Sequence, residues 1–209
     1  MKNKVLVFMA HPDDAEIWAG GTLLNHHMQG DEILFVYTFC NDEIRKQEAI
    51  KTADKFNAKA EFWNWPIDPQ GSANLVANFK PTIIITHWEG DTHHEHVKTY
   101  ESVMEMVPIL AVSYRLKFNI YCCDCYNSLG RNPHVPFVPT DFIDITFTWN
   151  EKREMISAYK SQPINYWLEM VGNQNRMHGS RVGVEYAEGF IQIPVLGIMR
   201  KSKKLLGGS

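Results

Sequence analysis

The chain has 209 residues, of which 44% are hydrophobic and 22% charged, and its formal net charge at pH 7 is -3. This composition is typical of a globular domain, and the chain lacks the net positive charge that is typical of a nucleic-acid-binding protein. A membrane span is also excluded, because no run of about 18 or more apolar residues is present.

The length predicts a single domain over residues 1–200. Residues 201–209 are basic and glycine-rich and are expected to form a flexible tail. Residues 1–4 lead directly into an apolar strand, so no removable signal peptide is expected.

Cysteine usage points to a reducing compartment. Cysteines occur at positions 40, 122, 123 and 125, without the second pair that a zinc ribbon needs. We therefore expect buried, reduced thiols in a cytoplasmic protein, with a redox pair of Cys122 and Cys125 as the alternative.

Hydrophobic periodicity and Gly/Pro signals define the elements along the chain. The predicted elements are, in chain order, a strand at 4–9, a helix at 16–29, a strand at 31–39, a helix at 42–57, a strand at 60–65, a loop at 66–72, a short helix at 74–79, a strand at 82–87, a helix at 94–115 kinked by Pro108, strands at 118–126 and 137–146, helices at 151–160 and 166–176, and a last strand at 189–195. Strands that alternate with helices predict an α/β fold with a mostly parallel sheet.

Two polar clusters follow two of these strands. His11-Pro12-Asp13-Asp14 comes after the strand at 4–9, and Asp91-Thr92-His93-His94-Glu95-His96 comes after the strand at 82–87. The carboxyl ends of parallel strands lie at one edge of a sheet, where ligands bind in such folds. The two clusters are therefore expected to share one site.

A nucleotide-binding domain is the first alternative for this arrangement. The turn after the first strand carries acids instead of Gly-x-Gly-x-x-Gly, and acids repel a pyrophosphate. No Gly-x-x-x-x-Gly-Lys-Ser/Thr run exists in the chain. Nucleotide-phosphate binding is set aside on these grounds.

Imidazoles and carboxylates together predict a metal-dependent hydrolase. A catalytic zinc takes three protein ligands and keeps a position for water, and His11, Asp14 and His96 supply such a set. Asp13 then remains beside the metal to take a proton from water. His93 is the candidate to stabilise an oxyanion, with Glu95 fixing its tautomer.

Several motifs together resemble the PIG-L/LmbE family of zinc-dependent N-deacetylases. The main ones are His11-Pro12-Asp13-Asp14-x-Glu16, Gly20-Gly21 and Asp91-Thr92-His93-x-Glu95-His96, with further likeness in Arg45-x-x-Glu48, Asp144-Ile145-Thr146, Ser161-Gln162 and Tyr186-Ala187-Glu188. The resemblance covers nearly the whole chain. It implies a Rossmann-like, mostly parallel sheet flanked by helices.

The resemblance also implies an activity and its residues. His11, Asp14 and His96 would hold Zn²⁺, with iron or cobalt as alternatives, and Asp13 would act as base and as the acid for the leaving amine. Arg45 would contact substrate hydroxyls or phosphate. The substrate would be a small amino sugar of the N-acetylglucosamine type or its conjugate, and assembly as a homotrimer or hexamer is implied.

Two aromatic residues have both a binding and a packing interpretation. Tyr186 either helps to polarise the substrate carbonyl or packs, and Trp88 either stacks on a sugar face or belongs to the core. Two other functions stay open: a zinc hydratase with the same ligands, and a non-catalytic zinc-binding module. The spare base Asp13 argues against the module.

Overall fold

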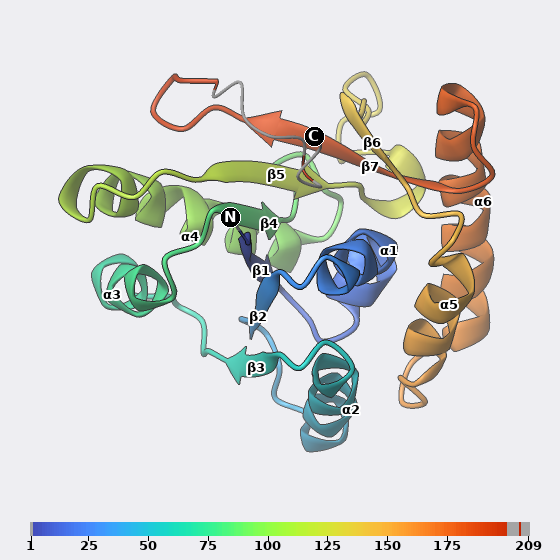
Figure 1. Ribbon diagram of the computed structural model, residues 1–209, viewed down its shortest axis with the longest axis horizontal. Coiled ribbons are helices and arrows are strands. Elements are labelled where there is room, and N and C mark those ends of the chain that lie inside the picture. The colour runs from blue at the N-terminus through green and yellow to red at the C-terminus, as the bar shows by residue number, and fades with distance from the viewer. Residues whose placement is uncertain (1, 200–204, 206–209) are drawn as a thin grey trace.

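The computed structural model describes residues 2–199 and residue 205. In this part of the chain a seven-stranded sheet has the spatial order β3-β2-β1-β4-β5-β7-β6 and carries helices on both faces (Figure 1). The strands are β1 (Lys4–Met9), β2 (Glu32–Tyr37), β3 (Lys59–Phe62), β4 (Ile83–Thr86), β5 (Asn119–Cys123), β6 (Asp141–Asp144) and β7 (Ala187–Ile193).

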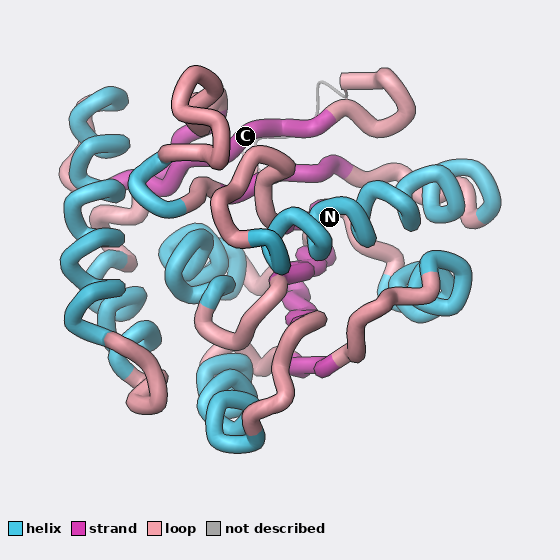
Figure 2. The backbone as a smooth tube through the Cα atoms, turned by 180° about the vertical axis from the view of Figure 1, so that it is seen from behind, coloured by secondary structure: helices cyan, strands magenta, loops and turns pink. Residues whose placement is uncertain are grey.

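Neighbouring strands from β3 to β5 are parallel, whereas β7 is antiparallel to both β5 and β6. The α-helices are α1 (Asp14–Met28), α2 (Glu43–Asp54), α3 (Pro69–Phe79), α4 (His94–Pro108), α5 (Trp149–Ser157) and α6 (Ile164–Val182). The view from behind shows the helices in front of and beside the strands (Figure 2). The predicted α/β fold with a mostly parallel sheet is confirmed.

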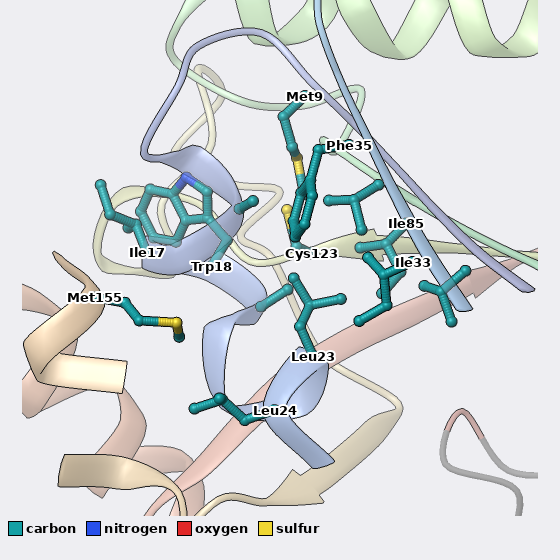
Figure 3. Packing of buried hydrophobic residues seen from close by; sticks show 14 of the residues in the cluster. Met9, Ile17, Trp18, Leu23, Leu24, Ile33, Phe35, Ile85, Cys123 and Met155 are labelled. Atoms are coloured by element: carbon teal, nitrogen blue, oxygen red, sulfur yellow. The ribbon is translucent and has the colours of Figure 1, made fainter. Parts of the chain in front are cut away.

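Alternation along β1 explains why both faces of the sheet are covered. Val5 and Val7 join the core beneath α1, α2, α5 and α6, whereas Leu6 and Phe8 join the core beneath α3 and α4. Figure 3 shows part of the first core, with Leu23 of α1 beside the strands. Since each fully buried aliphatic side chain contributes roughly 1.5–3 kcal/mol, a central strand apolar on both sides anchors the fold.

The chain order places a topological switch point between β1 and β4. From β1 the chain runs outward to β2 and β3, and then returns to form β4 on the other side of β1. In open α/β sheets, ligands bind at such a point beyond the carboxyl ends of the strands. Both predicted polar clusters follow these two strands.

Helix boundaries differ from the predictions where local signals are weak. The predicted helix at 166–176 is longer, because α6 runs to Val182 with buried Gln174, Asn175 and His178 along one face. The predicted helix at 94–115 ends at Pro108, and one turn of π-helix at Ile109–Ser113 follows it. The helix predicted at 74–79 begins earlier, because Asp68 caps it and Pro69 occupies its first turn.

The four cysteines are buried and unpaired, as expected of thiols. No helix of the described residues has the length and apolar character needed to cross a membrane. Of the predicted tail, residues 201–204 and 206–209 lie outside the described residues, whereas Leu205 is 1% exposed and joins the core beside α1.

Candidate metal centre and active site

A tight turn joins β1 to α1 and carries the first motif. The backbone N–H of Asp14 donates to the carbonyl oxygen of His11 at 3.2 Å, and the N–H of His11 donates to Oδ2 of Asp14 at 2.7 Å. Asp13 lies between them with φ 97°, a left-handed conformation that is uncommon outside glycine and recurs at functional sites. The turn brings the three side chains to the wall of one cavity.

Asp14 lies at the centre of a histidine cluster. Its carboxylate is 3.3 Å from Nδ1 of His11, 3.4 Å from Nε2 of His96 and 3.3 Å from Nε2 of His87. Burial favours a neutral carboxyl, but the charge of His96 and the contacts with His87 and His11 outweigh it. Together they lower the pKa of Asp14 well below its usual value. Asp14 is therefore a carboxylate at neutral pH and a suitable ligand for a cation.

His96 is oriented by a second carboxylate. Its Nδ1 lies 2.8 Å from Oδ2 of Asp91, whose other oxygen accepts the backbone N–H of His93 at 2.9 Å. Because Asp91 occupies Nδ1, the Nε2 atom faces Asp14 and has no hydrogen-bond partner although it is buried. Carboxylates commonly orient metal-binding histidines in this way.

His93 begins α4, and its ring nitrogens have distinct roles. Nδ1 accepts the backbone N–H of Glu95 at 3.3 Å, and burial together with His96 and His11 lowers the pKa of the imidazole. A neutral ring that accepts at Nδ1 carries its proton on Nε2, which makes it a hydrogen-bond donor. The Glu95 carboxylate, expected beside His93, instead lies 2.6 Å from Nε2 of His11.

Asp13 is held by Arg45 of α2. The guanidinium Nη2 donates to Oδ1 of Asp13 at 2.7 Å, and Nε donates to the carbonyl oxygen of Pro12 at 2.9 Å. The second oxygen of Asp13, Oδ2, is buried without a partner. Burial and the neighbouring Asp14 raise the pKa of Asp13 to about 7, although Arg45 opposes the rise. This is the range in which a carboxyl can both accept and release a proton.

His87, at the end of β4, is a further imidazole of the cluster. Its ring stacks on His96 with centroids 3.8 Å apart, and burial lowers its pKa to about 4, so that it is neutral. Its Nε2 accepts the backbone N–H of Ala10 at 2.9 Å. This hydrogen bond occupies the lone pair of Nε2, the His87 atom that lies 3.3 Å from the Asp14 carboxylate.

The residues present fit a zinc ion. Among the described residues, two groups offer metal-type ligand atoms within 4.8 Å of one another: His11, His93 and His96, and Asp14, His87 and His96. The predicted ligands His11, Asp14 and His96 span both groups and offer two imidazoles and a carboxylate. Such a set is typical of catalytic zinc, and the unpartnered buried Nε2 of His96 is the kind of atom that a metal would satisfy.

A cavity of about 290 Å³ opens beside these residues. It is lined by His11, Asp13, Asp14, Ile17, Arg45, His93, Tyr126, Gln162 and Trp167. The last three lie after β5 and near the start of α6, far along the chain from the two clusters. Only Gln162 carried a sequence signal, as part of Ser161-Gln162, and the signal assigned it no role. A cavity of about 430 Å³ between β2, β3 and α3 contains no residue of the histidine cluster.

Two predicted substrate residues lie elsewhere. Trp88 packs against Phe137 with ring centroids 5.5 Å apart and is 7% exposed. Tyr186 stacks on Trp149 at 4.4 Å, and its hydroxyl accepts a hydrogen bond from Arg176. Neither residue lines the cavity of about 290 Å³. His94 is exposed, and its ring stacks on that of His93 with centroids 5.5 Å apart.

Solved structures share this fold at low sequence identity. The hydratase GalB, described as the 4-carboxy-2-hydroxymuconate hydratase from Pseudomonas putida, is 21% identical with a TM-score of 0.77, and the match covers 98% of this chain and 99% of that one. The N,N'-diacetylchitobiose deacetylase from Pyrococcus horikoshii has the same identity and TM-score over 93% and 85%. A conserved protein from Thermus thermophilus is 19% identical over 97% and 100%, with a TM-score of 0.78.

A family model matches part of the amino-acid sequence, in addition to the fold likeness to the solved structures. The model described as PIG-L, GlcNAc-PI de-N-acetylase, matches residues 6–107. These residues include β1, β4 and both polar clusters. Residues 6–107 thus match this family model, and the resemblance of the chain to the PIG-L/LmbE family is confirmed.

Proposed function

We propose that this protein is a zinc-dependent hydrolase that removes an N-acetyl group from an amino sugar of the N-acetylglucosamine type or its conjugate. His11, Asp14 and His96 would hold the metal. The observation that carries the proposal is the buried, unpartnered Oδ2 of Asp13, whose side chain lines the same cavity as His11 and Asp14. A metal site alone does not need a second carboxylate held ready next to it.

The reaction follows from the chain's own groups. A zinc ion held there supplies Lewis acidity, which polarises a carbonyl oxygen and makes a nearby water easier to deprotonate. Asp13 takes the proton of the attacking water on its free Oδ2 and later returns it to the leaving amine. His93 donates its Nε2–H to the oxygen on which negative charge develops. Arg45 keeps Asp13 aimed by binding its other oxygen.

A hydratase is the second candidate, and the fold likeness to GalB supports it. The same base would take a proton from water, which would then add across an activated double bond without release of an amine. The family match to a de-N-acetylase supports hydrolysis instead. A non-catalytic zinc module has no use for the arrangement at Asp13.

Three finer expectations belong to the same proposal: a small amino-sugar substrate, assembly as a homotrimer or hexamer, and a cytoplasmic location. The cavity of about 290 Å³ suits a monosaccharide-sized group, with the remainder of a conjugate outside it. Light scattering of the purified protein tests the assembly.

The experiment compares two products. The zinc-loaded protein is incubated with a panel of N-acetylglucosamine conjugates, and free amine and acetate are measured together. The proposal predicts equal amounts of both. A parallel incubation with 4-carboxy-2-hydroxymuconate follows the loss of its conjugated double bond. Turnover of that compound, with neither amine nor acetate from the panel, would replace the deacetylase proposal with the hydratase.

A further inference from the structure

The segment between α5 and α6 reaches the cavity with one polar side chain, that of Gln162. A short series of hydrogen bonds, starting on α2, fixes this segment. Both oxygens of the Glu48 carboxylate bind Ser161: Oε1 accepts the backbone N–H at 3.0 Å, and Oε2 accepts the hydroxyl at 2.5 Å. Hydrogen bonds to an ionised carboxylate are among the stronger ones in proteins.

The direction of these bonds decides which end of the Gln162 amide binds Ser161. A serine hydroxyl has one hydrogen, and Ser161 gives it to Glu48. Toward Gln162 the same hydroxyl can therefore only accept, and it lies 3.1 Å from Nε2 of the Gln162 amide. The amide therefore turns its NH₂ group to Ser161, and this contact leaves Oε1 available as an acceptor on a side chain that lines the cavity.

Glu48 and Arg45 lie one turn apart on α2. Arg45 binds Asp13, and Glu48 binds the segment that carries Gln162, and both Asp13 and Gln162 line the cavity. Glu48 is 9% exposed, and its two hydrogen bonds join residues that are 113 positions apart in the chain. One helix thus positions both the proposed base and Gln162.

We propose that Gln162 is a substrate-binding residue that accepts a hydrogen bond from a hydroxyl or amide N–H of the substrate, and that Ser161 and Glu48 are positioning residues that hold its amide in this orientation. The inference rests on the proposed amino-sugar substrate and adds a specificity rule to it. Substrates that place a hydrogen-bond donor opposite Oε1 of Gln162 are bound in preference to those that do not. A ligand that presents only acceptors there, such as a polycarboxylate, leaves Oε1 unsatisfied.

The test couples variants of the chain to analogues of the substrate. Gln162→Met removes the acceptor at nearly constant volume. The analogues are deoxy sugars that each lack one hydroxyl and an N-methyl amide that lacks the N–H. With the unchanged protein, one of these analogues should have a kcat/KM roughly tenfold below that of the full substrate. With Gln162→Met, the same analogue and the full substrate should have equal kcat/KM values. Equal losses for every analogue in both proteins would overturn the proposal.

The positioning role has its own readout. Ser161→Ala lets the amide turn over and should raise KM several-fold with kcat nearly unchanged, whereas Ser161→Thr keeps the hydroxyl and should restore KM. Asn165→Ala, at an exposed position in the first turn of α6, is the matched control and should behave as the unchanged protein. If Ser161→Thr and Ser161→Ala were equally impaired while their thermal midpoints matched the unchanged protein, the oriented amide would be excluded.

Failure of the proposed function gives a different result. If no panel member yields amine, binding of the same sugars is followed by ligand-observed NMR. A preference for donor-bearing sugars that disappears in Gln162→Met supports the acceptor role without deacetylation. Binding that ignores the analogue series, or no saturable binding at all, contradicts it.

Discussion

Arg45 binds Asp13 with one guanidinium nitrogen and the preceding residue, Pro12, with another. Nη2 of Arg45 lies 2.7 Å from Oδ1 of Asp13, while Nε binds the carbonyl oxygen of Pro12. A guanidinium held at two points fixes the direction of the carboxylate, whose other oxygen stays free. From the sequence, Arg45 was expected to contact the substrate. The structure shows that it binds the proposed base.

Replacement of Arg45 by methionine therefore affects the chemical step. The variant loses both hydrogen bonds at similar side-chain length, and a displaced base costs up to about 10²-fold in rate. We expect kcat to fall by roughly this factor while zinc content is unchanged. The matched control is Lys46→Met, whose charge lies over the Phe62 ring outside the cavity. A rise in KM with kcat unchanged would indicate substrate contact instead.

Asp13→Asn separates the base from the ligands. The amide keeps the shape of the side chain but cannot take a proton, and general-base catalysis contributes typically about 10²–10⁴-fold. We expect turnover to fall by that much and the zinc content to match the unchanged protein. Steady-state amine release and elemental analysis of the same sample check both parts. Loss of zinc from Asp13→Asn would mean that Asp13, and not Asp14 alone, is a ligand.

The motif glycines have a packing role that a pair of variants tests. A Cβ at Gly21 would lie 2.6 Å from two side-chain atoms of Ile145, closer than real Cβ contacts. Gly21→Ala is expected to destabilise the fold by about 1–3 kcal/mol, because Ile145 must shift to make room for the added methyl group. Urea unfolding measures the loss.

The control for Gly21→Ala is Gly172→Ala in α6. A Cβ at Gly172 would meet only ordinary contacts at 3.6 Å, with Trp149. Alanine in a helix interior is favoured over glycine, so this variant should gain about 0.4–1 kcal/mol. Equal stability of the two variants would contradict the close contact at Gly21.

Stability should fall in mild acid in part through His26. Burial lowers the pKa of His26, although its hydrogen bond with Asp31 opposes the shift. The folded chain therefore binds the proton less well than the unfolded chain, whose histidine titrates near 6.5. The stabilisation is present above that pH and decreases as the pH falls below it.

Asp31 acts in the same direction at lower pH. Burial favours its neutral form, but His26 and Asn3 outweigh this and lower the pKa of Asp31 below the usual 3.8. Its contribution to folding stability is therefore present above pH 3.8 and is lost as the pH falls through the lowered pKa of the folded chain. Urea unfolding from pH 7 to pH 5 should show a shallower decline for His26→Gln than for the unchanged protein. His27→Gln, at the partly exposed neighbouring position, is the control. An identical decline for His26→Gln would show that His26 does not contribute to the loss of stability in mild acid.

The strands and the two clusters were predictable because they depend on local pattern. Residues 5–9 and 83–87 of the two predicted strands are buried, and the carboxyl ends of such strands meet at one edge in any parallel sheet. The approach of His11, Asp14 and His96 follows from this. Each of these residues also has a chemical type that is uncommon in a core without a partner.

Contacts between side chains of distant segments were not predictable from local pattern. Glu95 was expected beside His93, but α4 turns its carboxylate to His11. Tyr126 and Trp167 reach the cavity from separate elements, and no spacing in the sequence connects them with the metal-type residues. Trp88 and Tyr186 are aromatic residues near strand ends, a position equally compatible with packing and with binding.

The central claim is that His11, Asp14 and His96 hold one zinc ion. The most direct measurement is the zinc content per chain, by elemental analysis after dialysis, of the unchanged protein and of His11→Ala, Asp14→Ala and His96→Ala. We expect about one zinc per chain in the unchanged protein and a large loss in each variant, because three ligands are the usual minimum for a catalytic site. A folded protein that takes up no zinc, or variants that retain it, would contradict the account.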